Sequence, residues 1–221
     1  MAYQNSGSFR DFIDTERFFI APVLQWNISD RTTLIVNFEY LNDNSFFDRG
    51  IPALSDGSLV LPITRTYSYP GLNDYTQTTY RVGYTFDHRF SDNWRIRNAL
   101  SISSDKRGGS RTDIADLLID NQFLPREFRD DESLTETYAL QTDLIGKFQT
   151  GSIQHQLLLG FDLTRRSGIG RGGDAILPPF DIFNPNYDTP EITDFQPFSF
   201  AGSDRTNTLG IYVQDQSDRS A

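Results

Sequence analysis

The residue types that most often carry catalysis or bind metals are scarce in this sequence. Its 221 residues include 2 histidines and no cysteine, which excludes disulfide frameworks and thiolate metal sites. His88 and His155 lie near predicted short turns on the apolar side of their segments, where packing is a commoner role than metal ligation. We find no Ser-His-Asp arrangement and no Gly-x-Ser-x-Gly motif. The sequence therefore indicates a protein that is not an enzyme.

Acidic side chains are abundant, but they form no recognisable catalytic or metal-binding pattern. Paired carboxylates can hydrolyse glycosides or bind calcium, yet no Asp-x-Asp-x-Asp-Gly loop is present. We interpret these acids as solvated loop residues and expect neither a resident cofactor nor a metal site. The two main groups are Asp113, Asp116 and Asp120, and Asp130, Asp131 and Glu132.

A glycine-rich stretch, Gly168 to Gly173, spells Gly-x-Gly-x-x-Gly. A dinucleotide site with this motif also needs a helix that offers its N-terminus to the pyrophosphate. Pro178 and Pro179 follow too soon for such a helix to form. We therefore expect the base of a loop rather than a nucleotide site.

Three long connections rich in aromatic residues, glycine and proline are better candidates for function. The first runs from Asn42 to Tyr75 and the third from Arg165 to Arg205; in the second, Thr112 is predicted to N-cap a short helix through Ile114 and Leu118. Flexible linkers are depleted in aromatic residues, so these connections suit a fixed binding surface.

The elements that hold these connections are segments in which apolar and polar residues alternate. Leu34, Val36 and Phe38 share one side of such a segment, because strand side chains alternate between faces. Strands of ten to sixteen residues exceed the usual length in globular sheets and suffice to cross a bilayer at a tilt. The predicted strands are 1–8, 17–28, 32–42, 76–90, 93–103, 134–149, 153–165 and 206–216.

Short turns alternate with the long connections along the chain. Outer-membrane barrels show this alternation, with short turns at the periplasmic end and long loops outside, whereas compact soluble domains rarely contain such loops. Trp26, Phe90 and Trp94 lie near the short turns, as expected for an aromatic girdle at a membrane interface. A soluble β-sandwich with aromatic residues at its ends is the alternative.

Composition limits the remaining classes. A net charge of -10 argues against nucleic-acid binding, and no run of 18 apolar residues predicts a spanning helix. Residues 1–7 lack the features of a signal peptide, and both ends of the sequence fall beside predicted strands. We therefore expect 1–221 to be an internal piece of a larger protein, the alternative being a small complete cytoplasmic β protein.

Several short motifs, in this order, resemble the barrel of TonB-dependent siderophore receptors over nearly the whole chain. They are Ser6-Gly-Ser-Phe-Arg-Asp-Phe12, Pro22 with Leu24-x-Trp26, Ser29-Asp-Arg-Thr-Thr-Leu34, Phe47-Asp-Arg-Gly-Ile-Pro52, His88-Arg-Phe-Ser-Asp-Asn-Trp94-Arg-x-Arg-Asn98 and Tyr212-Val-Gln-Asp-Gln216.

The resemblance implies an all-β, antiparallel transmembrane barrel segment with long extracellular loops: about eight strands of a barrel of about 22. It implies a place in the bacterial outer membrane, import of ferric siderophore as the transported ligand, and energy from the TonB complex. Residues 1–221 would be a partial barrel domain that lacks the plug, the TonB box and the C-terminal strand. TonB would then act through the missing N-terminal region.

The same resemblance makes the loop residues candidate siderophore contacts, because bulky, polar or anionic complexes need aromatic surfaces and cations. A soluble all-β ligand-binding module and a porin-like channel remain the alternative functions. The candidate ligand-binding residues are Arg49, Arg65, Tyr67, Tyr69 and Tyr75 in the first connection, and Phe180, Phe183 and Tyr187 in the third.

Overall fold

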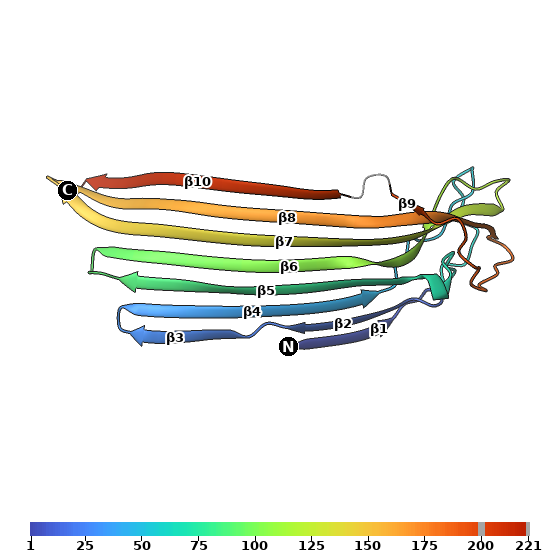
Figure 1. The fold of residues 1–221 in the computed structure, drawn as a ribbon, viewed down its shortest axis with the longest axis horizontal. Helices are drawn as coiled ribbons and strands as arrows, with labels where there is room; N and C mark the ends of the chain where they lie inside the picture. The colour runs from blue at the N-terminus through green and yellow to red at the C-terminus, as the bar shows by residue number, and fades with distance from the viewer. Residues whose placement is uncertain (199–201, 220–221) are drawn as a thin grey trace.

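The computed structural model describes residues 1–198 and 202–219, which form one antiparallel sheet and a short 3-10 helix, η1 (Pro70–Leu72). The strands lie side by side, with short turns at one end and the long connections gathered at the other (Figure 1). In this part of the chain no helix has the length and apolar character needed to cross a membrane. The strands are β1 (Ala2–Gly7), β2 (Asp14–Ile20), β3 (Val23–Ser29), β4 (Thr32–Ser45), β5 (Asp74–Arg89), β6 (Trp94–Ile114), β7 (Phe123–Thr150), β8 (Ile153–Asp181), β9 (Gln196–Pro197) and β10 (Gly202–Arg219).

Eight strands follow one another across the sheet in the order β1-β2-β4-β5-β6-β7-β8-β10, while β3 pairs with β4 and β9 with β8. The single strand predicted over 17–28 is divided at Ala21-Pro22, because proline has no amide hydrogen for the ladder. β2 and β3 nevertheless keep one register against β4, with Ile20 opposite Tyr40 and Val23 opposite Asn37. The path across the sheet thus has eight strands, with β3 continuing the line of β2, which confirms the predicted count of about eight.

Strand pairing sorts the side chains into an apolar and a polar face. In one row across the sheet, apolar residues are paired with apolar residues. The residues of the next row, which lie on the other face, are small or polar. One row consists of Leu24, Val36, Tyr84, Leu100, Leu140, Leu163 and Leu209. The adjacent row on the other face contains Asn37, Gly83, Ser101, Ala139, Thr164 and Thr208.

Aromatic rings border the apolar face at two levels. Phe90 follows Tyr80 by ten residues and Phe148 follows Tyr138 by ten, which at a rise of about 3.3 Å and a tilt of about 40° gives about 25 Å. An apolar band of about 25 Å between aromatic girdles is typical of outer-membrane barrels. In the girdle at the short-turn end, Trp94 covers Gly146, where a Cβ would lie 2.4 Å from the indole.

The second and third connections are shorter than predicted, because the strands continue past the girdle at the long-connection end of the sheet. β6 and β7 stay paired up to Ile114 and Arg126, and β7 and β8 up to Phe123 and Asp181. The helix predicted after Thr112 is wrong: Thr112 lies in β6 opposite Phe128 and is buried. Backbone pairing to β7 outweighed the local capping signal.

The buried core lies among the long connections at this end of the sheet. The first connection packs there against the ends of β7 and β8. The part of the sheet between the girdles has no second layer, so its apolar side chains stay largely exposed in this chain (Figure 1). The core comprises Leu61, Tyr67, Leu124, Phe180 and Ile182, with Ile51, Leu54, Leu118 and Tyr187 packed against it.

Replacing Leu100 by arginine tests the assignment of the two faces. In the complete protein folded into lipid vesicles, Leu100→Arg should cost about 2–4 kcal/mol, because it places a charge in the hydrocarbon. The neighbouring Ser101→Arg, on the polar face, is the matched control and should be tolerated. Denaturant unfolding gives both values; equal tolerance of the two variants would contradict the assignment.

Candidate ligand-binding site

The cluster of long connections is built around one buried cation, Arg126 of β7, which is 1% exposed. Its guanidinium carbon lies 4.1 Å from the centre of the Tyr69 ring and 4.3 Å from that of Phe180. It donates hydrogen bonds to the carbonyl oxygens of Tyr67 and, at 3.4 Å, Pro178. Among the described residues it has no ion-pair partner, so aromatic faces and carbonyl dipoles compensate its desolvation.

Arg126 therefore joins three segments that are far apart in the sequence: the first connection, β7 and the end of β8. The third connection adds Tyr187, whose hydroxyl donates to the Thr66 carbonyl at 2.8 Å and whose ring lies 5.7 Å from that of Phe180. These contacts make the first and third connections one ordered unit.

Burial also raises the pKa of two phenols in this unit. The pKa of Tyr67 rises well above its ordinary value, and the pKa of Tyr187 rises as well. A phenol of ordinary pKa is already neutral at physiological pH, so burial extends the neutral form of both side chains to more alkaline pH.

Arg65 borders the same unit from the first connection. Its Nη1 donates to the Ile182 carbonyl at 3.0 Å, and its own carbonyl accepts from Arg10 at 3.2 Å. The Arg65 side chain thus bridges the first connection to the chain just after β8.

A second cluster, which is charged, lies beside the first around Asp113 of β6. The carboxylate, 5% exposed, accepts from Arg49 at 2.9 Å and from Arg111 at 3.1 Å. Arg111 also pairs with Asp131 and packs over the ring of Tyr75 at 5.5 Å. This network anchors the start of the first connection to the extended β6–β7 hairpin.

The eight predicted site residues thus fall into three groups. Arg65, Tyr67, Tyr69, Phe180 and Tyr187 meet in the Arg126 cluster, where Tyr67, Tyr69 and Phe180 are buried. Arg49 and Tyr75 belong to the Asp113 cluster, and the Arg49 side chain is 50% exposed. Phe183 directly follows the buried Ile182 but is itself exposed.

Arg126, the centre of the first cluster, and Arg111, which pairs with Asp113 in the second, were not predicted as site residues from the sequence. Both lie in the stretch that the alternation pattern assigned to the second loop. The apolar series that runs through Tyr138 and Leu140 does not reach them, because Asp130, Glu132 and Glu136 occupy the even positions in between. The alternation pattern therefore gave no signal for either arginine.

The site can therefore bind by surface and charge, without covalent chemistry. Aromatic rings and guanidinium groups suit a bulky polar ligand. Within the described part of the chain, no group of three or more His, Cys, Asp or Glu side chains could hold a metal ion.

Known proteins similar to this chain share one architecture. A model of the TonB dependent receptor-like β-barrel matches residues 25–219. The chain is 29% identical to the metal-pseudopaline receptor CntO of Pseudomonas aeruginosa, over 98% of this chain and 31% of that protein. It is also 29% identical to the ferrioxamine B receptor of Salmonella typhimurium, over 91% of this chain and 29% of that receptor. The chain thus spans about a third of the length of these relatives.

The fold is also that of solved receptor structures. The open form of Fiu, the ferric-catecholate import receptor of E. coli K12, superimposes with a TM-score of 0.82 at 22% identity, over 97% of this chain and 36% of Fiu. Receptors of this kind are outer-membrane proteins and not enzymes, which confirms the predicted fold class, location and absence of catalysis. The chain belongs to the family of TonB-dependent receptor-like β-barrels.

Proposed function

We propose that the chain is part of an outer-membrane receptor that binds ferric siderophores and imports them with energy supplied by TonB. The observation that carries the proposal is one sheet that combines an apolar band between aromatic girdles with an ordered aromatic and cationic cluster beyond it. Relatives named as receptors for metal-pseudopaline and for ferrioxamine B support a metal chelate as the ligand.

We further propose that residues 1–221 supply one part of a larger barrel. The described sheet ends at β1 and β10, which do not pair with each other, and unpaired edges are not tolerated in hydrocarbon. Further strands of the receptor would cover both edges and close a barrel of about 22 strands. The plug and the segment that contacts TonB would lie in the remainder of the receptor.

Within the site, we assign different roles to exposed and buried residues. Arg49, Phe183 and the accessible part of Tyr187 are the candidate ligand contacts. Tyr67, Tyr69 and Phe180 would instead hold the surface in shape around Arg126, because ligand cannot reach side chains that are 2–5% exposed. Arg65 and Tyr75 lie at the edges of the two clusters and connect the candidate ligand contacts to the supporting residues.

Uptake of radiolabelled ferric siderophore by cells that carry the full-length receptor tests the proposed function. Accumulation should require TonB and should saturate, since the receptor binds its ligand before import. A porin-like channel would give accumulation that is unsaturable and independent of TonB, and a soluble binding module would give none. Either result would overturn the proposal.

Replacing Arg65, Tyr67 and Tyr69 together by alanine should weaken ferric-siderophore binding by at least tenfold. The variant removes two buried rings and a bridging cation, so the binding surface loses its shape while the membrane strands stay paired. Tryptophan quenching or calorimetry on the full-length receptor measures the affinity. Leu117→Ala, at the exposed tip of the β6–β7 hairpin, is the control; unchanged affinity in the triple variant would contradict the supporting role given to these three residues.

Arg126→Met should loosen the first connection without unfolding the barrel. The carbonyls of Tyr67 and Pro178 lose a charged donor worth about 1.5–3 kcal/mol, so amides around residues 66–70 should exchange roughly ten- to hundredfold faster. Arg126→Lys should rescue only in part, since an ammonium cannot lie flat between two rings. Hydrogen exchange with mass spectrometry measures the change, and unaltered exchange would contradict the role given to Arg126.

A further inference from the structure

The charge of the chain is distributed unevenly between the two ends of the sheet. The segments beyond the girdle at the long-connection end, which we call the mouth, are 8–14, 46–74, 111–132 and 171–198. They contain 17 acidic and 7 basic residues, a net charge of -10, and the whole chain also has a net charge of -10. All of the excess negative charge therefore lies at the end that carries the candidate ligand-binding site.

The basic residues of the mouth already have partners. Arg65, beside Tyr187, and the buried Arg126 donate to backbone carbonyl oxygens. The other five form ion pairs: Arg10 with Asp48, Arg49 and Arg111 with Asp113, Arg129 with Glu127, and Arg171 with Glu132. An approaching solute therefore meets little uncompensated positive charge from these groups.

Most acidic residues of the mouth are not compensated. Within the described residues, 12 of them form no ion pair, and 10 of these 12 are exposed. Unpaired charges of one sign around a binding surface attract solutes of the opposite sign and repel those of the same sign. The exposed acids include Asp11, Asp56, Asp116, Asp120, Asp188 and Glu191.

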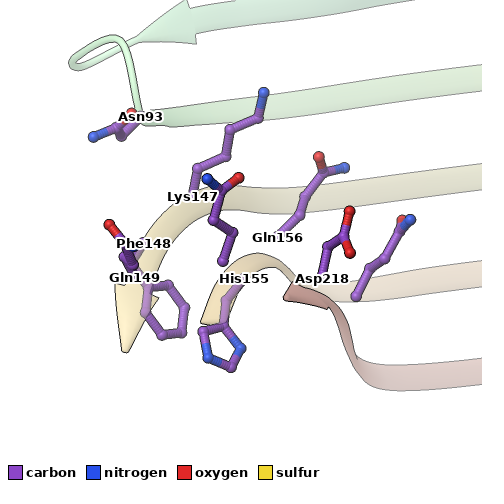
Figure 2. A pocket seen from close by; sticks show the side chains of 9 residues that line it. Asn93, Lys147, Phe148, Gln149, His155, Gln156 and Asp218 are labelled. Carbon is purple, nitrogen blue, oxygen red and sulfur yellow. The ribbon is translucent and has the colours of Figure 1, made fainter. Parts of the chain in front are cut away.

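The short-turn end of the sheet is different. Figure 2 shows a depression of about 420 Å³ at that end, where Lys147 and Asp218 are accompanied by carboxamides such as Gln156. Outside the mouth the acidic and basic residues of the chain are equal in number. The negative field is thus a property of the mouth and not of the whole sheet.

An aromatic corner lies within this negative region. The ring of Phe12, which is 54% exposed, lies 5.0 Å from the ring of Tyr187 at an angle of 61°. Phe12 has a φ of 65°, which bulky residues rarely adopt, and the Asp11 amide holds this turn by donating to the Thr64 carbonyl at 2.7 Å. Asp11 and Asp188, both exposed and unpaired among the described residues, directly adjoin the two aromatic residues in the sequence. Ring faces beside free carboxylates suit an ammonium group.

We propose that the ferric chelate bound at the mouth carries a net positive charge, on an ammonium or similar cationic group outside the iron-binding atoms. The proposal rests on the proposed function, that a ferric chelate binds at this end. The field of the free carboxylates attracts such a chelate and repels an anionic one. Its cationic group binds at the corner of Phe12 and Tyr187, through ring faces and charge-assisted hydrogen bonds to Asp11 and Asp188.

The required charge selects among the chemistries that bind ferric iron. Iron held by three singly charged hydroxamate groups is neutral, so one ammonium group makes the chelate cationic. Iron held by three doubly charged catecholate groups is strongly anionic, and one ammonium group cannot reverse that charge. The proposed ligand is therefore a hydroxamate-type chelate with a free amine.

A charge series of chelates tests the proposal on the full-length receptor. A linear ferric trishydroxamate with a free amine, its N-acetyl derivative and its N-succinyl derivative share one iron-binding core and differ in the charge at one end. Affinity measured by calorimetry should fall in that order, by about fivefold or more at each step at low ionic strength. The differences should shrink in about 0.5 M salt, which screens the field.

The double variant Asp11→Asn with Asp188→Asn tests the place of the cationic group. It removes two charges with little change in side-chain size, and it should lower the affinity for the free-amine chelate about fivefold and that for the N-acetyl derivative much less. Asp30→Asn with Asp92→Asn, in the short turns, is the matched control and should alter neither affinity. Heat-modifiable migration establishes that each variant is folded.

Uptake of radiolabelled chelates separates failure of this proposal from failure of the proposed function. Equal affinities across the series, preference for the succinyl derivative or for a ferric triscatecholate, or a free-amine affinity that responds to neither salt nor the double variant would each overturn the proposal. So would failure of the series to bind to a receptor that imports another ferric siderophore. In all of these cases TonB-dependent uptake of a ferric chelate leaves the proposed function standing, whereas uptake of none would overturn both.

Discussion

Backbone hydrogen bonding between neighbouring strands is the constraint on which the rest of this structure depends. Between the girdles the sheet has no second layer, so a buried core contributes little there and the ladder itself holds the strands. The register of strand pairing then decides on which face each side chain lies, because a slip of one residue would exchange the apolar face for the polar one. The row through Leu100 and the row through Ser101 differ by that single step. Even Pro22, which interrupts a strand, leaves the register against β4 unchanged.

Beyond the girdle at the long-connection end, side-chain contacts rather than backbone pairing hold the chain together. Here the first connection is fixed by side chains: Arg126 between two rings, and Asp113 among arginines. These charged groups are partly or wholly buried. In the interior, each hydrogen bond is electrostatically stronger than it would be at the surface. The apolar band is thus specified by a repeating backbone pattern, and the cluster of long connections by a few individual side chains.

This division explains what the sequence could reveal. Alternation is a local pattern, so the eight strands across the sheet, their faces and the short turns followed from residues such as Leu34, Val36 and Phe38. The ends of β6, β7 and β8 did not, because glycines and charged residues such as Gly108, Gly109 and Asp130 hide the alternation there. Tyr67, Tyr69 and Phe180 were predicted as site residues, but their burial depends on Arg126, 57 to 59 positions away from the two tyrosines. No local pattern reports such a contact.

The paired extension of β6, β7 and β8 past the girdle separates the residues that set the position of its tip from the residues displayed there. The β6–β7 ladder keeps one register from the apolar band to Ile114 opposite Arg126, so the position of the tip beyond is set by backbone pairing and not by the residues it carries. Substitutions at 115–122 can therefore change the surface of the tip while the apolar rows below keep their pairing. The tip is thus a place where the chain can accept new side chains at little cost to the sheet.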